Sequence, residues 1–98
     1  MAAGVTFALG GDFTADERMA AFLITLSRRY ALRGFSATRL RLAMSRTDIG
    51  NYLRLAPETV SRVLRRLQDM KVLRIDRREV ELLNHDYLHA LGRPILRE

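Results

Sequence analysis

Two short helical patterns separated by only three residues constrain the fold of this chain more than any other feature. The first covers residues 46–53, with Ser45 before it as an N-cap and Asp48 as a shortened capping box. The second begins at Pro57, a residue suited to the first position of a helix. Its apolar residues recur at i, i+3, i+4 and i+7, namely Val60, Val63, Leu64 and Leu67. Two helices joined by so short a turn predict a helix-turn-helix motif.

The patterns on either side of this motif predict one further helix and a small sheet. Helical spacing of apolar residues from Asp16 to a stop at Gly34 predicts a first helix. Residues 39–44 alternate between polar and apolar, which predicts a short strand with Leu40, Leu42 and Met44 on its buried face. Residues 72–75 and 80–83 predict two strands around a tight turn that lacks Gly or Asn, so its type stays open.

Asn84 is the expected cap of a last short helix that runs to Leu91, with Gly92 and Pro94 as stop signals. The predicted fold class is mainly α with a small β hairpin, a winged helix-turn-helix in which the hairpin is the wing. Residues 1–13 are interpreted as a flexible leader and residues 14–98 as the winged-helix domain. Two tyrosines, Tyr30 and Tyr52, fall on apolar stripes and are expected in the core.

The basic residues are concentrated in the predicted helix-turn-helix and wing. Residues 39–78 hold 11 basic and four acidic side chains, a net charge of +7, whereas the whole 98-residue chain carries +6. A basic surface can simply be solvated, or it can bind an anionic membrane or a nucleic acid. Sixteen of the 17 basic residues are Arg, whose planar fork suits phosphates and guanine edges. The distribution therefore favours nucleic acid.

Other classes of protein lack support in the sequence. With no cysteine, the chain has no disulfide framework, no thiolate metal site and no cysteine nucleophile. Charges interrupt every apolar stretch before the roughly 20 residues of a membrane span, and no secretory signal is recognisable, so we expect a cytoplasmic protein without membrane contact. No catalytic constellation appears, so no enzyme is predicted. His85 and His89 have a metal-compatible spacing, but two ligands make a weak motif and a surface capping turn is the favoured interpretation.

Residues 45–53 and 57–64 closely resemble the helix-turn-helix signature of the Crp/Fnr family of bacterial transcription regulators. Upstream, segments between residues 16 and 36 resemble the region that joins the dimerisation helix to the DNA-binding domain in the Fnr-like branch. The resemblance covers roughly residues 14–91 and implies a C-terminal DNA-binding domain. It also implies that the sensory β-barrel and the dimerisation helix of the family are absent from this chain. We therefore expect no cofactor here.

The resemblance further implies that Glu58, Ser61 and Arg62 read the bases. The chemistry agrees, because a carboxylate accepts from cytosine, an Arg fork binds guanine, and a small Ser admits a thymine methyl. The Crp branch has an Arg in place of Pro57 and a Gly in place of Ser61, so the implied half-site is of the TTGAT type. One departure from the family is Ala56, which replaces a capping Ser or Thr.

Each candidate site residue also has an ordinary structural interpretation. Glu58 and Arg62 have the i, i+4 spacing of an exposed salt bridge. Arg46 and Thr47 fit a capping turn, and Arg77 and Arg78 fit a solvated hairpin tip. Of Arg65 and Arg66, one is expected to reach phosphate while the other stays in solvent. The expected DNA backbone contacts are Arg46, Thr47, Thr59, Arg65, Arg77 and Arg78.

The leading hypothesis is sequence-specific binding of double-stranded DNA, with a homodimer in the full-length regulator and a palindromic operator. RNA polymerase is the further partner that the resemblance implies. The alternative is a winged-helix module for protein interaction or dimerisation, and a weaker option is non-specific nucleic-acid binding. The interaction hypothesis depends on an uncovered apolar stripe near Met19 and Phe22, which would cause self-association of the chain.

Overall fold

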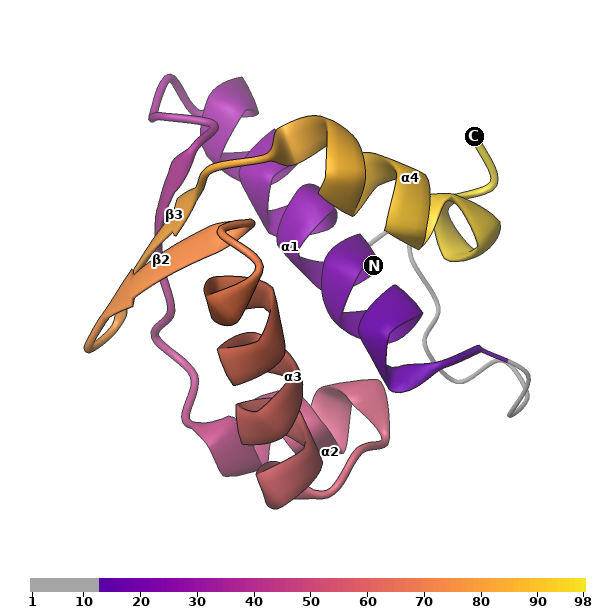
Figure 1. The fold of residues 1–98 in the computed structure, drawn as a ribbon. Helices are drawn as coiled ribbons and strands as arrows, with labels where there is room; N and C mark the ends of the chain where they lie inside the picture. The colour runs from indigo at the N-terminus through magenta and orange to yellow at the C-terminus, as the bar shows by residue number, and fades with distance from the viewer. Residues whose placement is uncertain (1–12) are drawn as a thin grey trace.

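The computed structural model describes residues 13–98, and the first helix, α1 (Ala15–Leu32), lies at the centre of them (Figure 1). A complete capping box begins it: the Glu17 N–H donates to Thr14 Oγ1 at 3.0 Å, and the Thr14 N–H donates to Glu17 Oε1 at 2.9 Å. The predicted leader lies outside the described residues except for Phe13, which packs against the core. The first predicted helix is therefore confirmed, with its start one residue earlier than expected.

The helix-turn-helix consists of α2 (Arg46–Leu53) and α3 (Pro57–Asp69), as the sequence predicts. Ser45 caps α2 by accepting from the Asp48 N–H at 3.1 Å, whereas α3 begins at Pro57 with no side-chain cap at Ala56. The four apolar residues that predict the buried face of α3 are all buried. The expectation that Tyr52 belongs to the core was wrong, because its side chain lies at the edge of the core with 42% of its surface exposed.

The predicted hairpin is part of a three-stranded antiparallel sheet (Figure 1). Its strands are β1 (Arg39–Arg41), β2 (Leu73–Asp76) and β3 (Glu79–Leu82), in the order β1-β3-β2. Val80 pairs with Leu40 on one side and Ile75 on the other, so the inner face of the sheet is apolar. The first strand is shorter than predicted: Leu42 is buried beyond its end, and Met44 is only half-buried. Leu83 follows β3 and is exposed, contrary to the predicted strand.

The last helix, α4 (His85–Leu96), is longer than predicted, and Gly92 and Pro94 lie inside it. Asn84 caps it as expected, accepting from the Tyr87 N–H at 3.1 Å. A Cβ on Gly92 would lie 2.8 Å from the backbone nitrogen of Ala21, so this glycine permits a close approach of α4 to α1 instead of ending the helix. Burial of Ile95 one turn further along gives a reason for the helix to continue past Pro94.

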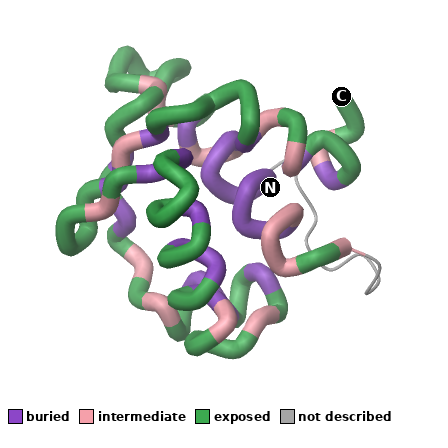
Figure 2. Tube along the Cα trace, viewed as in Figure 1, coloured by how far each residue is buried: buried purple, intermediate pink, exposed green. Residues whose placement is uncertain are grey.

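The apolar side of α1 is covered within the chain itself. Met19 is fully buried and Phe22 is 7% exposed. Figure 2 shows α1 as a largely buried segment between α4 and the helix-turn-helix. The expectation of an uncovered stripe near these two residues was therefore wrong, because both belong to the core and the Phe22 ring meets Tyr52 of α2 at a centroid distance of 5.8 Å. The self-association hypothesis loses its structural basis.

Candidate nucleic-acid interface

One side of α3 is buried and the other faces outward, which makes its outer side the candidate recognition surface (Figure 2). Glu58, Ser61 and Arg62 are all exposed there, and Arg65 follows one turn later. The spacing i, i+3, i+4 and i+7 places these four side chains along one stripe of the helix. The structure thus brings together the three residues that the sequence predicts to read bases.

These side chains are not engaged within the described part of the chain. The i, i+4 salt bridge between Glu58 and Arg62, which was the ordinary interpretation of this pair, does not form: neither residue has an ion-pair or hydrogen-bond partner among residues 13–98. Ser61 and Arg65 likewise have no such partner in that region. The whole stripe presents its donors and acceptors to solvent, where a ligand can meet them.

The turn before α3 is held tightly by backbone contacts. The Leu55 N–H donates to the Gly50 carbonyl at 2.8 Å, and a Cβ on Gly50 would collide with the Leu55 carbonyl oxygen. Arg54 takes the left-handed conformation at φ 61° to reverse the chain. At the start of α3, the Val60 N–H donates to the Ala56 carbonyl at 3.0 Å. The angle between α2 and α3 is therefore set by the backbone and by a glycine that cannot be enlarged.

The first turn of α2 lies beside this stripe. Arg46 and Arg65 line one groove, together with Ser61 and Gln68, between α2, α3 and the sheet. Thr47 is exposed in the same turn of α2, whereas Thr59 is half-buried at the start of α3. The groove is also lined by Asp69, so its two cations outnumber one carboxylate, and together with the N-terminus of α2 they favour an anion such as phosphate near Arg46 and Arg65.

The hairpin tip presents two further cations. Arg77 and Arg78 form the two-residue turn between β2 and β3, and both are exposed. Arg77 has φ 58°, in the left-handed region where Gly or Asn is usual, so an arginine here costs conformational energy. Neither side chain has an ion-pair partner within residues 13–98.

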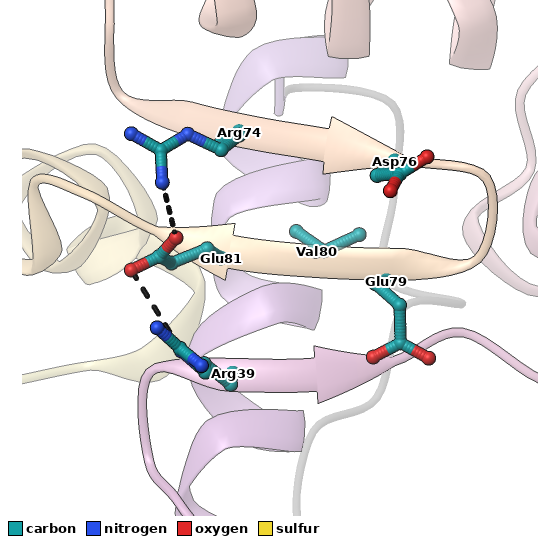
Figure 3. Close-up of a pocket in the computed structure, with 6 residues that line it drawn as sticks. All are labelled: Arg39, Arg74, Asp76, Glu79, Val80 and Glu81. Carbon is teal, nitrogen blue, oxygen red and sulfur yellow. Dashed lines mark hydrogen bonds and ion pairs between the residues drawn. The ribbon is translucent and has the colours of Figure 1, made fainter.

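The outer face of the sheet, in contrast, is neutralised by acidic residues (Figure 3). Glu81 pairs with Arg74 at 2.9 Å and with Arg39 at 3.9 Å, and Arg41 pairs with Glu79 at 3.1 Å. Both glutamates lie just beyond residue 78, so counting charges over residues 39–78 overstates the positive charge of this face. The sheet face is therefore a poor candidate for phosphate binding.

Arg66, unlike Arg65, is also paired. It forms two hydrogen bonds with Asp16 of α1, at 2.6 Å and 3.3 Å. This hydrogen bonding raises the pKa of Arg66 above its ordinary value. Arg65 is thus the one whose side chain is available for phosphate. Within residues 39–78, the cations without an ion pair to the described residues are Arg46, Arg54, Arg62, Arg65, Lys71, Arg77 and Arg78.

The sequence analysis did not identify Arg18, a buried arginine of α1. Its Nη1 donates to the Leu53 carbonyl at 3.1 Å, and its Nε donates to the Phe13 carbonyl, also at 3.1 Å. Arg18 lies one turn before Phe22 on the apolar side of the helix, and that position was the only signal in the sequence.

No group of three metal-ligating side chains occurs among the described residues. His89 instead lies 2.9 Å from a carboxylate oxygen of Glu98, and His85 is exposed at the start of α4. The helices of residues 13–98 include none with the length and apolar character needed to cross a membrane.

Comparison with known proteins agrees with this geometry. The family model described as the Crp-like helix-turn-helix domain matches residues 17–91, which include α2, α3 and the whole sheet. The chain belongs to the Crp-like helix-turn-helix family. The resemblance inferred from residues 45–53 and 57–64 is thereby confirmed, and so is the winged helix-turn-helix fold.

Relatives of this Crp-like domain are transcription regulators and not enzymes. The transcriptional activator protein Anr of Pseudomonas protegens is 54% identical over 79 residues, which are 81% of this chain and 32% of Anr. The anaerobic regulatory protein of Pasteurella multocida is 61% identical over 61 residues, or 62% of this chain and 22% of that protein. The chain thus spans about a third or less of the length of these relatives.

Solved structures of the same family share the fold of the Crp-like domain. FixK2 from Bradyrhizobium japonicum has 44% identity and a TM-score of 0.73, over 83% of this chain and 39% of its own. The catabolite activator protein of Thermus thermophilus has 25% identity and a TM-score of 0.63, over 83% of this chain and 35% of its own. A Crp-like helix-turn-helix is a DNA-binding domain, and α3 is its second helix.

Proposed function

We propose that this Crp-like domain binds double-stranded DNA sequence-specifically, with α3 in the major groove. The observation that carries the proposal is the outer stripe of α3, where Glu58, Ser61 and Arg62 are exposed and without intramolecular partners. An α-helix fits the major groove, and this set of side chains matches the hydrogen-bonding groups of base edges. The half-site that these residues favour is of the TTGAT type.

The flanking cations would hold the DNA backbone on both sides of α3. Arg46 and Arg65 approach phosphates from the groove beside α2, with Thr47 and Thr59 as nearby hydroxyl donors. Arg77 and Arg78 reach the backbone from the wing. Phosphate contacts of this kind set the register and supply affinity, whereas the base contacts supply specificity.

The full-length regulator is proposed to act as a homodimer on a palindrome. Two copies related by two-fold symmetry place their recognition helices about 34 Å apart, in successive major grooves. Such a regulator acts on transcription through RNA polymerase, and its need for DNA places it in the bacterial cytoplasm. The isolated domain should bind more weakly than a dimer, because two linked half-sites act as one event.

Fluorescence anisotropy with a labelled TTGAT duplex and a scrambled duplex, at several salt concentrations, tests the proposal. We expect preference for the TTGAT duplex and a decrease in affinity with salt, with a slope of about −0.9 per phosphate contact. Equal affinity for both duplexes would leave only non-specific binding, and a flat salt response would refute DNA binding.

Arg62→Ala and Arg65→Ala form a matched pair, since each removes one exposed arginine from α3. We expect Arg62→Ala, and likewise Glu58→Ala, to cost about 1 to 3 kcal/mol on the matched duplex and to relax the preference at one base pair. Arg65→Ala should weaken binding to both duplexes equally. Equal losses in all variants on both duplexes would contradict base reading by α3.

A further inference from the structure

We propose that Arg18 is a positioning residue for DNA binding: its guanidinium fixes the carbonyl end of α2, and with it the start of α3. This inference rests on the proposed role of α3 in DNA recognition. Arg18 touches no part of the recognition stripe, so any effect on DNA passes through the helix-turn-helix that it holds.

The contacts of Arg18 join α1 and the segment just before it to the end of α2, 35 residues later in the sequence. Arg18 belongs to the first turns of α1, Phe13 precedes that helix, and Leu53 is the last residue of α2. Both hydrogen bonds go to backbone carbonyl oxygens, at 3.1 Å each. The planar guanidinium has several donors in a fixed geometry, so it can hold two acceptors at a set separation.

The Leu53 carbonyl is an acceptor that needs a partner. The last carbonyls of an α-helix have no donor within the helix, and the C-terminal end carries partial negative charge. A buried cation is costly unless it is hydrogen-bonded, and Arg18 is only 9% exposed with no carboxylate within ion-pair distance among residues 13–98. The arginine and the helix end therefore satisfy each other.

Holding Leu53 also determines where α3 begins. Only Arg54, Leu55 and Ala56 separate the two helices, and the Leu55 hydrogen bond to Gly50 keeps this turn rigid. The position of α2 relative to α1 thus also determines the position of the first turn of α3, which carries Glu58. A shift of the first turn of α3 relative to the wing would separate the base contacts of α3 from the phosphate contacts of the wing, which must be made together.

The test compares Arg18→Met, which keeps an apolar stem and removes every donor, with Arg18→Lys, which keeps the charge but has no planar fork. Arg28→Met is the matched control. It also removes one arginine from α1, but the side chain of Arg28 pairs with Glu98 and not with a residue of α2. All variants are measured in the 98-residue chain at a temperature where circular dichroism shows them folded. Affinities for the TTGAT and scrambled duplexes give a specificity ratio.

We expect Arg18→Met to lower the specificity ratio about tenfold, a loss of the size associated with one charged hydrogen bond, and Arg18→Lys to fall in between. Arg28→Met should change both affinities together and leave the ratio unaltered. A purely structural role would lower the melting temperature of Arg18→Met without changing the ratio in folded protein, and that result would overturn the proposal.

Amide hydrogen exchange of the free protein gives a readout that needs no DNA. Loosening of the α2 end should accelerate exchange at Leu55 and Thr59 in Arg18→Lys, which covers the case in which Arg18→Met does not fold. Unchanged exchange there, with an unchanged ratio, would refute the role of Arg18. If the unaltered chain shows no duplex preference, the proposed function fails, while the exchange result still decides whether Arg18 holds the turn.

Discussion

Replacing Gly92 by alanine tests how closely α4 and α1 pack. Helix propensity alone would make the substitution stabilising, whereas the close packing predicts that it destabilises the fold. The added Cβ would lie 2.8 Å from the backbone nitrogen of Ala21, 3.0 Å from its Cα and 3.2 Å from the carbonyl carbon of Ala20. Ordinary contact begins at 3.4 Å, and all three atoms are backbone that cannot rotate away. The two helices must therefore separate by several tenths of an ångström.

The magnitude follows from two opposing terms. Overpacking a core costs about 1 to 3 kcal/mol, and a contact with backbone belongs at the upper end of that range. Alanine gains about 1 kcal/mol over glycine in a helix interior. The net destabilisation is about 2 kcal/mol, which lowers the melting temperature of a domain of this size by roughly 8 to 16 °C.

Thermal unfolding followed by circular dichroism measures this change, with Ala90→Gly as control. Ala90 is exposed on the same helix, so its replacement reports propensity alone and should cost about 1 kcal/mol. DNA affinity of folded Gly92→Ala should be unchanged, because the recognition stripe lies on α3. A melting temperature of Gly92→Ala equal to or above that of the unaltered chain would refute the close approach of the two helices.

Three further substitutions have defined outcomes. Arg77→Asn should raise the melting temperature by a few degrees, because Asn tolerates the left-handed conformation. It should also flatten the salt dependence of DNA binding by about one unit of slope. An affinity loss confined to the matched duplex would contradict this. Asp16→Asn should release Arg66 and steepen that salt dependence, and an unchanged slope would show that the ion pair does not hold Arg66 from the DNA. Hydrogen bonding from Arg28 lowers the pKa of Glu98 from 4.5 to about 2, so the carboxylate stabilises the fold above pH 4.5 and loses that effect as the pH falls toward 2. The stability advantage of the unaltered chain over Glu98→Gln should therefore shrink over this range in acid titrations monitored by circular dichroism, and a constant difference would refute it.

Local signals in the sequence predicted most of the helices and their beginnings. Ser45, Pro57 and Asn84 mark the starts of α2, α3 and α4, because capping chemistry depends on the few residues beside a helix end. The buried face of α3 also followed from spacing alone. The recognition stripe could be predicted for the same reason, since a helix with one apolar face must present the other to solvent.

Pairing of charges could not be predicted in this way. Spacing within α3 suggested a salt bridge between Glu58 and Arg62, yet the ion pair that forms on this helix joins Arg66 to Asp16, 50 residues earlier in the chain. The neutral sheet face likewise depends on strands brought together by the fold. The final set of available cations was therefore decided by tertiary contacts.

The sequence by itself determined the helix-turn-helix, the wing and the residues on the outer stripe of α3. Tertiary structure decided the course of the chain past Gly92, the exposure of Tyr52 and the burial of Arg18. Glycine is a common helix stop because it readily adopts left-handed conformations. At Gly92, however, the absence of a side chain is needed for the close approach of α4 to Ala21, and the packing of α4 on α1 outweighs that local preference. Arg18 is held in the core by the carbonyl of Leu53, 35 residues away, and only the folded chain brings that carbonyl to it.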